Sequence, residues 1–169
     1  MDFTLSEQTN RFRADVKALL AEQVTDEVVA TMHESGTFNN RGLNAALADA
    51  GLLEGAVPGF GDRDPVELYI LFNELEKAGA PYDGLAVSML VAGVIHSVGT
   101  GFHRTEVFNR LTTGRHNCCL GYSEPDHGSD VAAITTRAAR EGDGWVIDGR
   151  KMWTTMAHES DWVLLLTRT

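Results

Sequence analysis

Two kinds of hydrophobic periodicity divide this chain. Up to about residue 116, apolar side chains recur every three or four positions, which is the spacing of amphipathic helices. Beyond Asn117 they form short apolar runs separated by turn residues, which is typical of strands. The pattern therefore predicts an α+β protein with a helical domain over residues 1–116 and a β domain that begins over 117–169.

Five helices are predicted in the first part. The first covers residues 6–23, with Thr4 and Ser6 as competing N-caps. A second, with leucines and alanines along one face, ends at Gly51, because glycine tolerates the left-handed conformation that closes a helix. A short helix near the end of this part stops at Gly114.

Two longer helices lie between these. After a glycine-rich loop over 55–62, Asp64 is placed to cap a helix and Pro65 to occupy its first position, and this helix ends at Gly79. The segment 83–98 is apolar on nearly every face. That pattern predicts a helix buried among the others.

The strands are predicted from apolar runs and turn dipeptides. They cover residues 118–122, 132–139, 145–147 and 162–166. Asp143-Gly144 is typical of a hairpin turn, and Asp148-Gly149 repeats the pattern before residues 150–153. A β segment of about 50 residues rarely forms an independent core. We therefore expect the sheet to be only the first part of a larger one.

Composition excludes several classes. The chain has 14 Lys+Arg and 24 Asp+Glu, a formal charge of −10, which argues against binding nucleic acid by bulk charge. The apolar stretch 85–98 is too short to span a membrane, and no secretory signal opens the chain. Cys118 and Cys119 are adjacent and cannot form an ordinary disulfide, which favours a reducing, cytoplasmic setting. The histidines show no metal-ligand spacing, so no metal site is predicted.

The segment from Gly121 to Asp130 contains the candidate ligand-binding residues. It lies between two predicted strands, whereas a dinucleotide or P-loop turn leads into a helix. Its backbone N–H groups and the hydroxyls of Tyr122, Ser123 and Ser129 suit the edge of a flat polar ring or a pyrophosphate. The alternative is a surface turn.

Two motifs together resemble a known family. Ser123-Glu124-Pro125 with Gly128-Ser129-Asp130, followed by Gly149-Arg150-Lys151-Met152-Trp153-Thr154-Thr155, resembles the two flavin-contacting signatures of acyl-CoA dehydrogenases. In that family an N-terminal helical domain, a middle β domain and a C-terminal helical bundle enclose FAD. The resemblance implies a helical domain followed by the beginning of an antiparallel β-barrel-like middle domain, with the C-terminal bundle absent from this chain.

The resemblance also assigns roles to residues. Ser123 would bind the pyrimidine side of the flavin, Trp153 would lie against the isoalloxazine, and Thr155 would approach N5. Ser129 would contact the FAD pyrophosphate region and also the thioester arm of the substrate. For Trp153 the alternative is a half-buried aromatic of a strand. The full set of expected cofactor-binding residues is Leu120, Tyr122, Ser123, Gly128, Ser129, Trp153, Thr154 and Thr155.

The sequence departs from the family pattern in two respects. Asp126 replaces a usual glycine, and His127 stands where a small residue is common; the His-Gly-Ser wording also occurs in acyl-CoA oxidases. The family's general base is a glutamate that, in most members, lies in the C-terminal domain. No residue of this chain is therefore assigned as catalytic, and Glu124, in the flavin turn, is not taken as the base.

The function implied is FAD-dependent α,β-desaturation of an acyl-CoA thioester in fatty acid and lipid metabolism. Electrons would leave through an electron-transferring flavoprotein. The FAD-containing protein to which this chain belongs would itself be a flavoprotein that forms a homo- or hetero-oligomer. The alternatives are a non-catalytic subunit of a hetero-oligomeric acyl-CoA dehydrogenase, or an acyl-CoA oxidase or flavin monooxygenase of the same superfamily. We expect this oxidoreductase chain, as a fragment or subunit lacking the base, to be inactive by itself.

Overall fold

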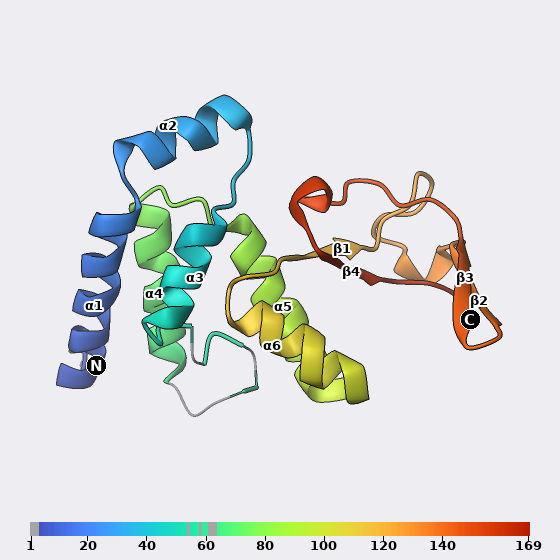
Figure 1. Ribbon diagram of the computed structural model, residues 1–169, viewed down its shortest axis with the longest axis horizontal. Helices are drawn as coiled ribbons and strands as arrows, with labels where there is room; N and C mark the ends of the chain where they lie inside the picture. Colours follow the sequence, from blue (N-terminus) through green and yellow to red (C-terminus); the bar gives the residue numbers. More distant parts are fainter. Residues whose placement is uncertain (1–3, 54, 58, 61–63) are drawn as a thin grey trace.

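Helices and strands occupy separate sides of the molecule (Figure 1). The computed structural model describes residues 4–53, 55–57, 59–60 and 64–169. The helices are α1 (Glu7–Gln23), α2 (Asp26–Ser35), α3 (Arg41–Asp49), α4 (Pro65–Lys77), α5 (Asp83–Val98) and α6 (Asn109–Thr112), with a π-helical turn at His103–Phe108 before α6. The strands are β1 (Cys118–Gly121), β2 (Arg137–Glu141), β3 (Gly144–Asp148) and β4 (Trp162–Leu165).

Local signals account for the ends of several helices. The Ser6 side chain accepts from the Thr9 amide and caps α1, so Ser6 rather than Thr4 is the N-cap. Asp64 likewise accepts from the Val66 amide at the start of α4, with proline at the first position as predicted. The glycine-rich loop predicted before α4 lies only partly within the described residues.

Helix α2 was not predicted from the sequence. It is capped by the Thr25 side chain and ends at Gly36, which has a left-handed φ of 67°. Met32 is its buried residue. Val28 and Val29 are half-buried, and the apolar positions of this short helix are too few for periodicity to reveal it.

The core lies between α1, α3, α4 and α5. Its fully buried side chains include Val16 of α1, Leu47 of α3, Leu75 of α4 and Ala92 of α5. The prediction that 83–98 forms a helix buried among the others is confirmed only in part, because Leu90 is 48% exposed. This face of α5 is not covered by another element of the described chain, whereas β1 packs against the helix elsewhere.

The strands form two separate pairs. β2 and β3 make an antiparallel hairpin, with Arg137 opposite Asp148. β1 and β4 run parallel, with Cys118 opposite Trp162, because the chain crosses over through the hairpin between them. The antiparallel barrel-like arrangement is thus not confirmed: one pair is parallel, and the described residues contain no closed sheet.

The strand predicted over 132–139 is displaced. A 3₁₀ turn occupies Val131–Ala133, and β2 starts only at Arg137. The amides of Thr135 and Thr136 donate to the Glu124 carboxylate, which removes them from pairing with a strand. Likewise, no strand forms over 150–153, within the part that the structure describes.

The two cysteines lie side by side in β1. Both are buried and neither forms a disulfide. Burial raises the pKa of the Cys118 thiol to about 11. They are therefore small buried side chains of the strand, which the sequence analysis expected to form no ordinary disulfide. Among the described helices, none combines the length and apolar character needed to cross a membrane.

Candidate functional site

Two segments that are distant in the sequence meet at one pocket of about 250 Å³. One segment is the end of β1 with the residues after it, and the other follows β3; α5 supplies Val87. The lining residues are Val87, Leu120, Tyr122, Ser123, Met152, Trp153 and Thr155. Five of the eight expected site residues are therefore brought together here.

The other three expected residues lie outside this lining. Thr154 is half-buried within the second segment. Gly128 and Ser129 are exposed and follow a tight turn. In this turn the Glu124 amide donates to the His127 carbonyl at 2.8 Å, and the His127 amide donates back at 3.2 Å. The turn therefore closes with Asp126 in place of the usual glycine.

Direct hydrogen bonds join the two walls of the pocket. The Met152 amide donates to the Ser123 carbonyl at 2.9 Å. The Lys151 ammonium donates to the Tyr122 carbonyl at 3.0 Å and to Glu124 Oε1 at 2.9 Å. Sequence reasoning placed Lys151 within the second motif but gave it no role, and it missed Val87 and Met152, whose place in the pocket only the tertiary fold determines.

Glu124 is fully engaged as a hydrogen-bond acceptor. Its Oε2 accepts from the amide and the hydroxyl of Thr135, both at 2.7 Å, and its Oε1 accepts from the Thr136 amide at 2.8 Å as well as from Lys151. Burial by itself raises the pKa of Glu124, but the bonds from Thr136, Lys151 and Thr135 outweigh it and hold the pKa well below its usual range. The carboxylate is thus a structural anion, unsuited to accepting a proton from a substrate.

Trp153 has an unusual conformation. Its φ is 56°, in the left-handed region, and the residue is 85% exposed at the pocket. It lies in no strand, so the alternative of a half-buried strand aromatic is wrong. A non-glycine residue in this region carries backbone strain, and such strain is concentrated at functional sites.

A separate apolar groove lies along α5. It has a volume of about 440 Å³ and is lined by Leu90, Gly93, Val94, Ser97 and Val98. Val87 of the pocket lies three positions before Leu90, so both belong to one face of the helix. The pocket and the groove therefore lie along the same face of α5.

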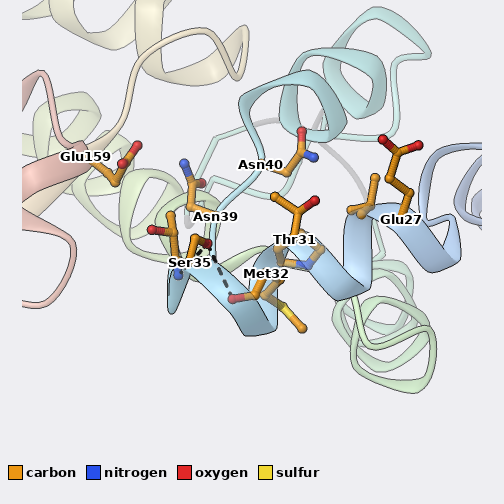
Figure 2. A pocket seen from close by; sticks show the side chains of 10 residues that line it. Glu27, Thr31, Met32, Ser35, Asn39, Asn40 and Glu159 are labelled. Carbon is orange, nitrogen blue, oxygen red and sulfur yellow. Dashed lines mark hydrogen bonds between the residues drawn. The ribbon is translucent and has the colours of Figure 1, made fainter.

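A third hollow, of about 380 Å³, lies between α2, the chain that follows it and Glu159. Figure 2 shows Thr31 and Ser35 on α2, with Glu159 on a separate segment. It is larger than the first pocket but holds none of the expected site residues. In the described ranges, no three His, Cys, Asp or Glu side chains gather as they would around a metal ion.

Comparisons with known proteins agree with these motifs. The family description "Acyl-CoA dehydrogenase, middle domain" matches residues 119–169. The chain is 33% identical to acyl-CoA dehydrogenase IpdE1 of Mycobacterium tuberculosis over 178 aligned positions, which cover 96% of this chain and 45% of the relative. The chain belongs to the acyl-CoA dehydrogenase family. It spans somewhat less than half the length of this curated relative.

Several solved structures share the fold. The ChsE4-ChsE5 complex from Mycobacterium tuberculosis matches with a TM-score of 0.84 and 30% identity, covering 100% of this chain and 44% of that chain. The structure named "Tcur3481-Tcur3483 steroid ACAD" matches with the same TM-score and identity, covering 100% and 45%. The helices and strands of this family member are thus arranged as in its solved relatives.

Proposed function

We propose that the pocket holds the isoalloxazine ring of FAD, and that the chain is part of an enzyme that desaturates an acyl-CoA thioester between its α and β carbons. One observation carries the proposal. Two segments with the family's flavin-contacting motifs meet at a single pocket, where Leu120, Tyr122, Ser123, Trp153 and Thr155 line the walls.

The chemistry of the lining suits a flat ring with one polar edge. Leu120, Val87 and the indole of Trp153 offer apolar surface, while Ser123 and Thr155 offer hydroxyls. The exposed indole would cover one face of the ring and exclude water from it. Ser123 would donate to the pyrimidine edge, and Thr155 would donate near N5. Thr154, half-buried between these neighbours, would contact the cofactor through its backbone.

The exposed turn after Ser123 would serve the extended parts of the ligands. Gly128 leaves room for a close approach, since nothing lies within 4 Å of where its Cβ would be. The Ser129 hydroxyl is accessible to the pyrophosphate of FAD and to the thioester arm of the substrate. The α5 groove from Leu90 to Val98 would bind the apolar part of the acyl group and reduce its contact with water.

A bound flavin would accept the hydride that leaves the β carbon. The chain's own part is to bind and orient the ring, to exclude water and to hold the acyl group. Glu124 takes no part in proton transfer, because Thr135, Thr136 and Lys151 already occupy its oxygens. The α-proton would be removed by a base outside this chain, and an electron-transferring flavoprotein would reoxidise the cofactor.

The proposal includes the domain division at residues 116 and 117. Helices end with α6, and strands begin with β1 at Cys118. The unclosed strand pairs would form the first part of a larger antiparallel β-barrel-like domain.

A second function is a subunit that contributes one wall of a flavin or substrate site in a hetero-oligomer. It is favoured by one solved relative, the ChsE4-ChsE5 complex, whose two chains carry different names. A visible flavin spectrum, recorded on the purified chain alone and with candidate partners, separates the two functions. Rapid peroxide formation upon reduction in air would instead indicate an oxidase.

Paired substitutions in the flavin-binding form test the assignment. Trp153→Ala is expected to weaken FAD retention by about 30–150-fold, if covering the ring is worth ~2–3 kcal/mol. Thr155→Val is expected to change the reduction potential or the hydride-transfer rate, with little effect on stability. Trp145→Ala is a matched control, since this exposed tryptophan lies on the hairpin, outside the pocket. Unchanged FAD affinity in Trp153→Ala and unchanged reduction in Thr155→Val would refute the flavin assignment.

A further inference from the structure

Lys151 and Glu124 form a nearly buried ion pair behind the pocket. The side chains are 10% and 3% exposed, and Lys151 Nζ lies 2.9 Å from Glu124 Oε1. The same ammonium group donates to the Tyr122 carbonyl. Lys151 therefore binds two parts of the first pocket wall while belonging to the second.

The carboxylate of Glu124 extends this contact to a third segment. It accepts from the amides of Thr135 and Thr136, just before β2. Three stretches of chain consequently meet at one carboxylate: the residues after β1, those before β2 and those after β3. Displacement of this carboxylate would loosen the contacts among all three stretches.

The segment over 149–156 needs such support because its backbone is strained. Trp153 has a φ of 56° and Met156 a φ of 63°. Such conformations persist only where the surrounding structure imposes them. Gly149 fixes the start of the segment, since a Cβ there would lie 2.5 Å from Thr136 Oγ1, and the buried Met156 fixes its end.

Between these two ends, Lys151 holds the segment in place through its bonds to Tyr122 and Glu124. It lies two residues before Trp153, and the Met152 amide between them is bonded to the Ser123 carbonyl. A buried ion pair adds little net stability over apolar residues of similar volume, because desolvation offsets the attraction. Its hydrogen bonds do, however, fix distance and direction on both sides.

We infer that Glu124 and Lys151 are positioning residues: their ion pair locks the segment after β3 against the segment after β1, and thereby holds the Trp153 indole at the pocket. This Glu124–Lys151 pair, which we call the clamp, forms without a ligand. Its consequence for the cofactor rests on the proposed function.

Hydrogen exchange in Lys151→Met tests the clamp directly. Methionine keeps most of the length of the lysine side chain and its apolar character, without the charge. Exchange at the Met152 amide and across 149–156 is expected to rise by about tenfold or more, while α5 amides stay protected. Lys151→Arg should restore part of the protection. Arg110→Met is the matched control, because it removes the exposed Arg110–Glu106 pair, whose side chains are 50% and 46% exposed, and it should leave 149–156 unchanged.

FAD affinity of the flavin-binding form is the second measurement. Lys151→Met should weaken it by about tenfold, which corresponds to ~1.4 kcal/mol. Faster exchange with unchanged FAD affinity would support the clamp and refute the assignment of the pocket to FAD. Unchanged exchange across 149–156 would overturn the clamp, whatever the affinity.

A double variant covers the case in which Lys151→Met fails to fold. Glu124→Gln with Lys151→Met leaves no unpaired buried charge, and it should fold with protected α5 amides but a freely exchanging 149–156 segment. Loss of α5 protection in this double variant would overturn the inference, because the pair would then serve folding in general rather than positioning.

Discussion

Trp153 combines an exposed side chain with a strained backbone. Its indole contributes little to the core, because 85% of the residue is accessible. Its φ of 56° costs free energy in the folded state. A residue with both properties adds nothing to stability by itself, which agrees with its proposed role as a surface for the cofactor.

The first prediction follows from this balance. Without flavin, Trp153→Ala is expected to change the free energy of unfolding by less than about 1 kcal/mol. Trp153→Gly should be more stable than Trp153→Ala by about 1 kcal/mol, because glycine adopts positive φ without a Cβ penalty. Urea unfolding of the three proteins measures both differences. A loss of several kcal/mol in Trp153→Ala would mean that the indole is packed in the native state.

At the scale of elements, Arg41 links α3 to the strands. Its guanidinium donates to Asp161 Oδ2 at 2.9 Å and to the Glu159 carbonyl at 2.6 Å, just before β4. Asp161 Oδ2 also accepts from the Asn117 amide at 2.9 Å, just before β1. One carboxylate therefore fixes the starts of both parallel strands against the start of α3.

The pH dependence of this link is the second prediction. Burial alone raises the pKa of Asp161, but the Asn117 amide and the Arg41 guanidinium lower it below its ordinary 3.8. A carboxylate with a depressed folded-state pKa stabilises the fold above the unfolded-state value, and this contribution is lost as the pH falls. Asp161→Asn should therefore cost about 1 kcal/mol at neutral pH, an amount limited by the partial exposure of both side chains.

Urea unfolding of the wild type and Asp161→Asn, from neutral pH to below pH ~4, provides the measurement. The two stabilities should converge at the acidic end. A difference that stays constant over this range would show that the ionised carboxylate does not supply the stabilisation.

At the scale of the whole molecule, apolar side chains are exposed to solvent both on the β2–β3 hairpin and on α5. Trp145, Val146 and Ile147 are exposed on the hairpin, and Leu90 and Val98 are exposed on α5. Contiguous apolar surface and unpaired strand edges promote association. We predict that the 169-residue chain is oligomeric or prone to aggregate at micromolar concentration, as measured by light scattering.

Two substitutions locate the surface that associates. Leu90→Lys should reduce association if the α5 face is responsible, and Val146→Lys should do so if the hairpin is. A stable, monodisperse wild-type monomer would contradict the prediction.

The last prediction concerns activity. The 169-residue chain by itself is expected not to desaturate any acyl-CoA, because Glu124 is bound as a structural anion and no other residue is assigned as the base. Assays with an artificial electron acceptor test this. Measurable turnover by the partner-free chain would show that a base does lie within it.

The sequence by itself determined the features that depend on neighbouring residues: helix ends, short motifs and the hairpin turn. The caps at Ser6 and Asp64, together with apolar periodicity, gave the ends of α1 and α4, and the apolar run predicted α5 at its observed bounds. The two motifs identified five of the seven residues that line the pocket, because the order and composition of a motif can be recognised without knowledge of the fold. The turn at 143–144 likewise gave the hairpin.

Only the tertiary structure decided the remaining features. The parallel pairing of β1 with β4 joins strands that are far apart in the sequence, and the tertiary fold buries Met32 of α2. Because Glu124 binds the Thr135 and Thr136 amides, β2 begins only after them. The ion pair of Glu124 with Lys151 joins the two motifs. These features depend on contacts between distant residues, and local periodicity carries no information about which distant residue a side chain will meet.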